Sequence, residues 1–404
     1  MKSLGEKFYI TTAIDYVNSV PHIGTAYEKI CADALARFMR LSGRDVFFLM
    51  GNDEHSTNVE KRAIALGLDP LKYCDDMEQR FVAVWKRLNI SYDKFIRTTC
   101  ADHRTAVAEL FTRIHNNGDI SKGKYSGWYC VSCEAYKKES DLQEGKCPVH
   151  RLEAKWIEEE NLFFALSKYR DRLLAHIEAH PEFIQPKIRR NEILGILNEK
   201  VEDVSISRSS TTWGVPVPSY PHQVIWVWFD ALINYISGVG FPGSSEPFNR
   251  YWPADMHVIG KDITRLHCIM WPAMLMSAGI PLPRSVFAHG FIYVKGQKMS
   301  KTLGTVIDPG EVADKFGTDA LRYFLLRETA FDKDGDFSWE KFFDRYNSDL
   351  ANDLGNLLHR TLNMVNRYQG GVLSSRGEPQ PIDANLKETI LAIPDRIVPM
   401  MESC

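Results

Sequence analysis

The segment GQKMSKTLG, residues 296–304, sets two lysines three positions apart in a short stretch bounded by glycines. The ammonium groups of Lys298 and Lys301 could supply positive charge to a bound anion. Taken alone, lysines beside glycine are most often part of a solvated surface loop. Whether these two cations do chemistry depends on what the rest of the chain places beside them.

Three cysteines and a histidine form a second group whose spacing suits chemistry. Two residues separate Cys130 from Cys133, and thirteen residues later Cys147 and His150 repeat that spacing. Two close ligand pairs joined by a polar loop suit tetrahedral zinc, and four filled positions leave no open site for catalysis. A lone C-x-x-C could be a redox pair, but the second pair favours a metal. The sequence predicts a structural zinc knuckle over 125–155 and a reducing compartment.

Four segments are typical of buried strands, and each runs into residues that could bind a ligand. KFYITTAI precedes PHIGT, DVFFLM precedes GNDEHST, DMHVIG precedes KDITRLHCIMWPAML, and SVFAHGFIYV runs into the lysine loop. Strands alternating with helices predict an α/β fold with a doubly wound parallel sheet, which binds ligands at the carboxyl ends of its strands. Each polar segment could be only a turn with a helix cap, but four at one edge favour a site.

Phosphate handling is the chemistry that this edge suggests. A helix that begins after Gly24 offers backbone N–H groups to an anion, His22 adds a donor, and the lysine loop adds positive charge. The chain has no G-x-x-x-x-G-K-[ST] loop, and no G-x-G-x-x-G follows its first strand. Both absences argue against an ordinary P-loop or dinucleotide-binding enzyme.

Length and charge set the broad class. The 404 residues predict two or three domains. With 49 basic and 52 acidic side chains the formal charge is −3, so any nucleic-acid contact would need a local patch. The opening segment MKSLGEKFYITTAID has no signal-type apolar core, and no run reaches the ~20 apolar residues of a membrane helix. We therefore expect a cytoplasmic protein with no membrane partner.

Five separated segments, taken in order, resemble those of the methionyl-tRNA synthetase family of class I aminoacyl-tRNA synthetases, in the bacterial type with a single zinc knuckle. They are AIDYVNSVPHIGTAYEKICADALARF, GNDEHST, VWFDALINY, IGKDITRLHCIMWPAML and KMSKTLGTVIDP. The resemblance runs from residue 8 to residue 368. It implies a Rossmann-type class I synthetase core with a zinc-knuckle insertion and part of a C-terminal α-helical domain.

The reaction implied by this resemblance has two steps. The carboxylate of methionine attacks the α-phosphate of ATP, which carries Mg²⁺, and displaces pyrophosphate. A hydroxyl of the terminal adenosine of the tRNA then takes the methionyl group. The first step needs no protein nucleophile, so positioning and charge stabilisation are what the protein adds. Lys298 and Lys301 would close over the triphosphate as charge builds on the pyrophosphate. The expected partners are methionine, ATP and tRNA, and the expected state is a monomer.

The resemblance also assigns roles to the residues that match the family's motifs. The expected catalytic residues are His22, Thr25, Lys298 and Lys301. The expected ATP-binding residues are His22, Gly24, Thr25, Glu28, Gly260, Asp262, His289, Lys298 and Lys301. Asp53 is expected to bind the methionine ammonium in a pocket formed by Ala13, Ile14, Tyr16, Trp228, Ala231, Leu232, Tyr235, Ile263 and His267. An aromatic lining suits a thioether, although VIWVWF alone is typical of a buried strand and His267 alone of a core histidine.

The chain departs from the family at one position of the first motif. That motif usually ends in a second histidine, where this chain has Thr25. A threonine hydroxyl can donate to a phosphate oxygen but carries no charge, which leaves His22, Lys298 and Lys301. Two alternatives therefore stay open: a methionine-activating paralogue that transfers the methionyl group elsewhere, and a non-catalytic binder of methionine or tRNA. The retained lysine pair counts against the second.

The expected domain organisation follows the family. Residues 1–117 and 216–295 would form the two halves of the catalytic domain, 118–215 the insertion with the zinc knuckle, 296–345 the lysine loop and stem-contact region, and 346–404 the start of an anticodon-binding helical bundle. PKIRRNE, residues 186–192, is either a basic patch or a solvated helix start. Amphipathic helices are expected from 347 and from 386. No tryptophan follows Trp339, and the chain is expected to be truncated or unusually short.

Overall fold

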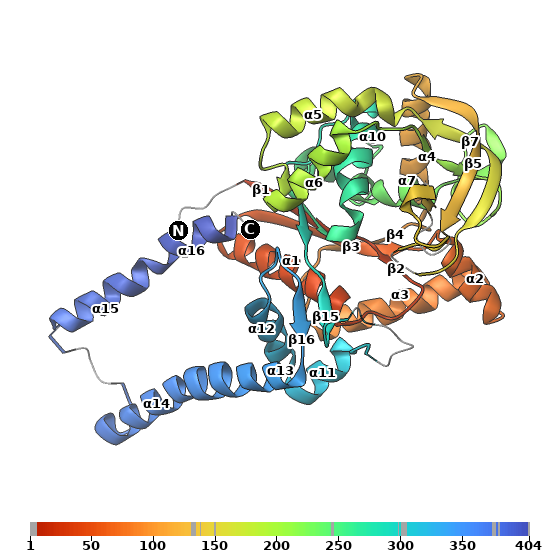
Figure 1. Ribbon diagram of the computed structural model, residues 1–404. Coiled ribbons are helices and arrows are strands. Elements are labelled where there is room, and N and C mark those ends of the chain that lie inside the picture. Colours follow the sequence, from red (N-terminus) through yellow and green to blue (C-terminus); the bar gives the residue numbers. More distant parts are fainter. Residues whose placement is uncertain are drawn as a thin grey trace. The chain divides into compact units, whose positions relative to one another are not determined.

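The computed structural model describes residues 6–130, 135–137, 139–148, 151–243, 246–297, 299, 305–373, 377–378 and 380–402 (Figure 1). The chain divides into two compact units, Met1–Gly290 and Phe291–Cys404. No helix among the described residues is long and apolar enough to cross a membrane.

The first unit is built on a seven-stranded sheet in which every pairing is parallel. Its strands are β1 (Lys7–Thr12), β2 (Asp15–Tyr16), β3 (Asp45–Asp53), β4 (Lys94–Arg97), β8 (Ile184–Gln185), β13 (Met256–Gly260) and β14 (Val286–His289). They lie in the order β2-β3-β1-β13-β14-β8, with β4 also paired to β3. The predicted doubly wound parallel sheet is confirmed. Its strands end at a common edge, where such sheets bind ligands.

Helices cover both faces of this sheet. The helices α1 (Ile23–Leu41) and α3 (Pro70–Arg87) lie on one face, while α4 (Ala101–Asn116) and α10 (Trp271–Ala278) lie on the other (Figure 1). Between α3 and β3 in the chain lies α2 (Thr57–Ala65). The buried residues of α3 recur every three or four positions, which is why this segment folds as a helix against the sheet.

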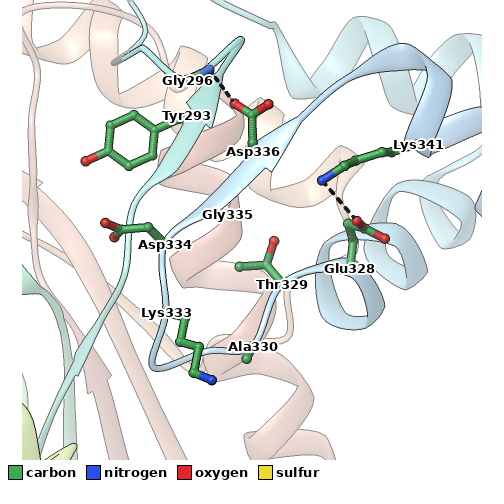
Figure 2. A pocket seen from close by; sticks show the side chains of 10 residues that line it. All are labelled: Tyr293, Gly296, Glu328, Thr329, Ala330, Lys333, Asp334, Gly335, Asp336 and Lys341. Carbon is green, nitrogen blue, oxygen red and sulfur yellow. Dashed lines mark hydrogen bonds and ion pairs between the residues drawn. The ribbon is translucent and has the colours of Figure 1, made fainter.

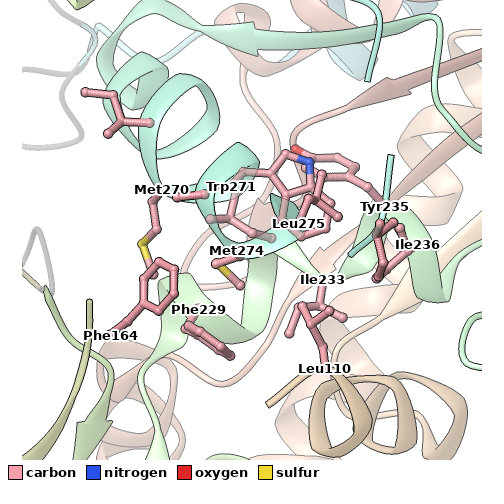
Figure 3. Close-up of a cluster of buried hydrophobic side chains, with 14 of the residues drawn as sticks. Leu110, Phe164, Phe229, Ile233, Tyr235, Ile236, Met270, Trp271, Met274 and Leu275 are labelled. Atoms are coloured by element: carbon pink, nitrogen blue, oxygen red, sulfur yellow. The ribbon is translucent and has the colours of Figure 1, made fainter. Parts of the chain in front are cut away.

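The apolar core beside the site lies between α4, α10, and the short helices α7 (Val227–Leu232) and α8 (Asn234–Ser237). Figure 3 shows its large members facing one another: Leu110, Phe164, Phe229, Ile233, Tyr235, Ile236, Met270, Trp271, Met274 and Leu275. Trp271 and Tyr235 are among the largest side chains with almost no exposed surface. Removing such a side chain from a close-packed core typically costs ~3–5 kcal/mol of stability, so the pocket walls carried by α7 and α8 are rigidly held.

Residues 118–225, which comprise the expected insertion and the start of the segment after it, are mainly antiparallel sheet. Four strands lie in the order β6-β5-β7-β9 and three more in the order β10-β12-β11. They are β5 (Ile120–Cys130), β6 (Ala135–Lys137), β7 (Lys155–Phe164), β9 (Val204–Ser205), β10 (Ser207–Arg208), β11 (Pro216–Val217) and β12 (Tyr220–Ile225), with helices α5 (Arg170–Ala179) and α6 (Lys187–Asn198). PKIRRNE starts α6, in accord with the helix-start alternative. Strand β8, within the same range, joins the main sheet instead.

The second unit pairs β15 (Ile292–Val294) with β16 (Gly335–Phe337) and is otherwise helical. Its helices are α11 (Pro309–Phe316), α12 (Thr318–Glu328), α13 (Trp339–Arg345), the π-helix η5 (Tyr346–Gly355), α14 (Asn356–Gln369), α15 (Pro381–Leu391) and α16 (Ile393–Glu402). Aromatic side chains pack its centre, with Phe342 in contact with the rings of Phe316 and Phe324. The leucines of the helix predicted from 347 are exposed, including Leu354, Leu357 and Leu358.

Three local expectations were wrong. SVFAHGFIYV is two strands in different sheets, because β14 ends at His289 and β15 begins at Ile292. The strand alternative for VIWVWF holds only to Ile225, after which α7 begins at Val227. The helix expected from 386 begins earlier, at Pro381, and ends at Leu391 before a separate α16. In each case a short apolar run fits a strand or a helix equally well, so the sequence pattern could not locate the break.

Candidate active site

The predicted site residues of the first unit gather at the carboxyl edge of the main sheet. The strands β3, β1, β13 and β14 are direct neighbours there, and Gly260 lies opposite His289 in the register of β13 and β14. Asp53 is the last residue of β3, and Ala13 follows β1 directly, with its N–H donated to the carbonyl of Val258 at 3.0 Å. The carboxyl edge of the sheet therefore carries the carboxylate of Asp53, the backbone of Gly260 and the imidazole of His289.

His22 begins α1 and acts as its N-cap. Its Nδ1 accepts hydrogen bonds from the backbone N–H groups of Gly24 (3.1 Å) and Thr25 (3.2 Å). In the neutral ring the proton is then on Nε2, so the Nε2–H group of His22 can donate a hydrogen bond to an anion. The expectation that the helix amides themselves face a phosphate needs correction in this state, because two of them donate to His22.

The predicted methionine pocket has an aromatic wall. The rings of Tyr16, in β2, and Trp228, in α7, meet edge to face with centroids 5.8 Å apart. Ala231 and Leu232 on the same helix are buried. Asp53 is 2% exposed. The cap of the helix that follows it is Ser56, whose Oγ accepts from Asn58 and Val59, so Asp53 is not that cap.

Tyr235 and His267 form a neutral polar pair in this pocket. His267 Nδ1 donates to the carbonyl of Ile263 at 3.0 Å, so its Nε2 must accept the hydroxyl proton of Tyr235 at 2.7 Å. Burial lowers the pKa of His267 to about 4, so the ring is uncharged at neutral pH. His267 lies in the π-helix η4 (Leu266–Met270), one turn beyond Ile263. A neutral hydrogen-bonded wall suits an uncharged side chain better than an ionic one.

The residues expected at the nucleotide are carried by three elements. Gly260 ends β13, and Asp262 is exposed in the short helix η3 (Lys261–Ile263) that follows. Glu28 of α1 accepts from His289 Nε2 at 2.9 Å, while His289 Nδ1 lies 2.7 Å from the carbonyl of Gly290. A carbonyl and a carboxylate both accept hydrogen bonds, so each ring nitrogen of His289 lies beside an acceptor.

Two buried polar clusters at this edge were not predicted. In the first, Asp230 of α7 accepts from His55 Nδ1 at 2.7 Å and from His103 Nε2 at 3.0 Å. Burial acts to raise the pKa of Asp230, but the two imidazoles lower it to about 2, so it stays ionised. In the second, Lys29 of α1 is fully buried beside Asp15 and Glu28. The only sequence signal for either was a charged residue within an otherwise apolar pattern.

Two of the four predicted zinc ligands lie within the described residues. Cys130 ends β5, and the carbonyl of Cys147 accepts a hydrogen bond from the N–H of Arg151 at 2.7 Å; both cysteines are buried. Cys133 and His150 lie outside the described residues, within which no three metal-binding side chains are grouped. Thiolates with an imidazole are the donor set that zinc prefers, and the burial of both described cysteines fits a closed structural site.

The two predicted catalytic lysines, Lys298 and Lys301, also lie outside the described residues. The strand that precedes the lysines in the chain is β15, and hydrogen bonds hold the residues on either side of it. Asp334 accepts from the N–H of Phe291 and Asp336 from the N–H of Gly296, each at 2.8 Å. Figure 2 shows these carboxylates lining a hollow of about 550 Å³. Three acidic side chains and two lysines line it, and none of the predicted ligand-binding residues that the structure describes is among its lining residues.

Comparison with known proteins agrees with this geometry. A model of the family described as tRNA synthetases class I (M) matches residues 8–155 and 138–362. The methionine–tRNA ligase of Thermotoga maritima is 51% identical over 401 residues, or 98% of this chain. The chain belongs to the methionyl-tRNA synthetase family. The predicted resemblance is thereby confirmed.

Other members of the methionyl-tRNA synthetase family match to a similar extent. The enzyme of Caldanaerobacter subterraneus subsp. tengcongensis is 48% identical across 98% of the chain. This chain spans 64% of the length of the Thermotoga relative and 62% of the Caldanaerobacter one. The solved structure of Mycobacterium tuberculosis methionyl-tRNA synthetase in complex with methionyl-adenylate has a TM-score of 0.96 at 47% identity, covering 98% of this chain and 79% of that one.

Proposed function

We propose that this chain activates methionine with ATP, forming methionyl-adenylate and pyrophosphate, and then transfers the methionyl group to the terminal adenosine of a tRNA. The observation that carries the proposal is a buried carboxylate, Asp53, at the same sheet edge as the neutral Tyr235–His267 wall. A carboxylate attracts an ammonium and an uncharged aromatic wall accepts a thioether, which together describe methionine. The adenylate held by the Mycobacterium relative supports the same substrate pair.

The roles of the site residues follow from their chemistry. Asp53 holds the methionine ammonium, so that the carboxylate is directed at the α-phosphate. Glu28, Gly260, Asp262 and His289 hold the nucleoside. His22 donates to the phosphates with Gly24 and Thr25 beside it, and Lys298 and Lys301 stabilise the departing pyrophosphate. Mg²⁺ enters with ATP as part of the substrate. Alignment of the two reacting groups provides the largest share of the rate, because no covalent intermediate with the protein is needed.

Two assays with the 404-residue chain test the proposal. We expect methionine-dependent exchange of pyrophosphate into ATP, and methionylation of the tRNA that carries a methionine anticodon. Exchange without any charging would favour a methionine-activating paralogue. No exchange, with methionine binding retained in calorimetry, would favour a non-catalytic binder and overturn the proposal.

The zinc knuckle is proposed to support the second step. When bound, the metal cross-links the ends of the knuckle. Cys130→Ser should release zinc, and tRNA charging should fall by about tenfold, because misplacement of the acceptor end by ~1 Å is enough for such a loss. Pyrophosphate exchange should change little. The measurements are metal content, exchange and charging of the same preparation.

Cys100→Ser is the matched control for the knuckle variant. It makes the same chemical change at the N-cap of α4, where serine also caps. Absence of zinc from the parent protein would contradict the proposal, as would equal losses of exchange and charging in Cys130→Ser.

Thr25→His should leave exchange unchanged or raise it slightly. Thr25 lies in the first turn of α1, where the helix terminus already favours an anion, so an added imidazole contributes at most ~0.3–1 kcal/mol. The kinetic constants for ATP, measured in the exchange assay, check this. A large loss would mean that the threonine is matched to a rearranged phosphate site, and would favour the paralogue.

A further inference from the structure

Lys29 occupies an unusual position for a lysine. It is on α1, and its side chain has no exposed surface. Its Nζ lies 2.8 Å from the carbonyl of Ala13, 3.0 Å from Asp15 Oδ1 and 2.6 Å from Glu28 Oε1. An ammonium has three protons, so these three acceptors satisfy it completely. The geometry is that of a fully coordinated cation rather than a side chain that happens to be covered.

The partners of Lys29 belong to different parts of the site. Ala13 follows β1 directly, and Asp15 is the first residue of β2, next to Tyr16 of the aromatic wall. Glu28 is bonded to His289 at the end of β14. Lys29 thus joins the segment on the methionine side to the acidic–imidazole pair on the nucleotide side.

The charges along this chain of contacts alternate. Asp15, Lys29, Glu28 and His289 follow one another as acid, base, acid and base. Burial acts against the charge on Glu28, but Lys29 and His289 lower its pKa below the usual value. Burial likewise acts against the ammonium, but Asp15 and Glu28 raise the pKa of Lys29. The charges on Glu28 and Lys29 are thus stabilised by their neighbours.

A buried ionic chain is a poor means of making a protein stable. Desolvation of charges largely offsets their attraction, and apolar residues of similar size often stabilise a fold equally well or better. Such a row of ion pairs does fix the positions of the groups it joins, because a fully hydrogen-bonded ammonium allows one arrangement of its partners. Orientation of the reacting groups is what the first step requires.

We propose that Lys29 is a positioning residue for methionine activation, which holds the Ala13–Asp15 segment and the Glu28–His289 pair in one mutual arrangement. The inference rests on the proposed function and goes beyond it, because Lys29 touches neither reacting group. Each substrate should still bind its own half of the site when Lys29 is lost, but the in-line approach of methionine to the α-phosphate should suffer. The effect should therefore appear in kcat rather than in KM.

The pH dependence gives a second readout, through Asp15. Burial raises the pKa of the Asp15 carboxyl to about 7, although the Lys29 ammonium acts to lower it. The ionisable groups around Asp15 are Lys29 and Glu28 on α1, Tyr235 on α8, and Asp53 on the paired strand β3. Above pH 7 the carboxylate is charged and its ion pair with Lys29 is complete; below pH 7 it is protonated and the pair weakens. We expect kcat to fall as the pH drops below 7, and the fall to be absent in Asp15→Asn.

The test uses the full chain with three variants. Lys29→Met removes the ammonium at similar length, but leaves two buried carboxylates without their cation, which can impair folding. The double variant Asp15→Asn/Lys29→Met removes one charge of each sign. It therefore still tests the positioning role if the single variant folds poorly. Lys7→Met is the control: Lys7 also pairs with a buried acid, Asp255, at 2.7 Å, at the opposite end of β1 from the site. Exchange kinetics are measured per folded molecule, with thermal unfolding alongside, from pH 6 to pH 8.5.

Both Lys29 variants should lose about tenfold in kcat, with KM for methionine and for ATP within about threefold of the parent, since misalignment acts on the chemical step. Lys7→Met should keep the parent kcat. A kcat within twofold of the parent in both Lys29 variants would overturn the inference, and so would a lower unfolding temperature with unchanged kcat, which marks a merely structural role. A parent with no methionine-dependent exchange overturns the proposed function instead and the inference with it.

Discussion

Lys301→Ala should slow methionine-dependent pyrophosphate exchange by about a hundredfold, because one donor to charge that develops in the transition state is worth ~3 kcal/mol. That charge appears late, on the pyrophosphate as its bond to the α-phosphate breaks. Methionine binding, which precedes it, should be nearly unchanged. The prediction separates a loss in kcat from a loss in affinity.

The measurement is the exchange rate at saturating methionine, together with the methionine affinity from calorimetry. Lys315→Ala is a matched control, because Lys315 is an exposed lysine on α11 of the same unit as the loop. Exchange by Lys301→Ala within threefold of the parent would remove the role proposed for the lysine loop, whatever the control shows.

Asp53→Ala should have the converse effect and raise KM for methionine by about tenfold to a hundredfold. A buried ammonium that loses its carboxylate gives up a charge-assisted hydrogen bond worth ~1.5–3 kcal/mol. Asp53 is almost fully buried at the end of β3, beside an aromatic and aliphatic wall, so little water can take the place of the carboxylate. Once methionine is bound, the chemical step should be less affected than its capture.

Asp53→Asn is the informative partner to this variant, since it keeps the shape and removes only the charge. Both substitutions should raise KM for methionine while KM for ATP changes little. The capping alternative for Asp53 is excluded by the structure, because Ser56 caps α2. An unchanged KM for methionine in both variants would therefore mean that the ammonium is bound elsewhere.

The architecture of the site was predictable because its signals are local. A strand rich in β-branched and aromatic residues can be recognised from about six to nine consecutive residues, and the polar residues that follow it mark the carboxyl edge. The strands β1, β3, β13 and β14 were all identified in this way, and parallel pairing brings their ends together in any doubly wound sheet. Asp53 and Gly260 could be placed at that edge from position alone, whereas His289 was expected within a longer strand.

The local pattern was less informative where two structures satisfy the same residues. Val227–Leu232 is apolar enough for a buried strand but forms the helix α7, on which Phe229 meets the ring of Phe111 of α4 in the core. That choice is made by packing with partners far away in the sequence. The helical conformation of this segment brings Trp228 against Tyr16. The residue pattern of the segment alone could not predict that contact.

By itself the sequence determined the family, the parallel α/β core, the candidate ligands at its edge and the spacing of the proposed zinc knuckle, because each is encoded in residues close together in the chain. Only the tertiary structure decided the ionic contacts behind the site. His55 and Asp230 are separated by 175 positions, and Glu28 and His289 by 261, yet each pair is within hydrogen-bond distance. A buried charge is stable only beside its partner, and that partner is chosen by how the strands and helices pack. Lys29 could therefore be recognised as a link between the two sides of the site only once the fold had brought Ala13, Asp15 and Glu28 around it.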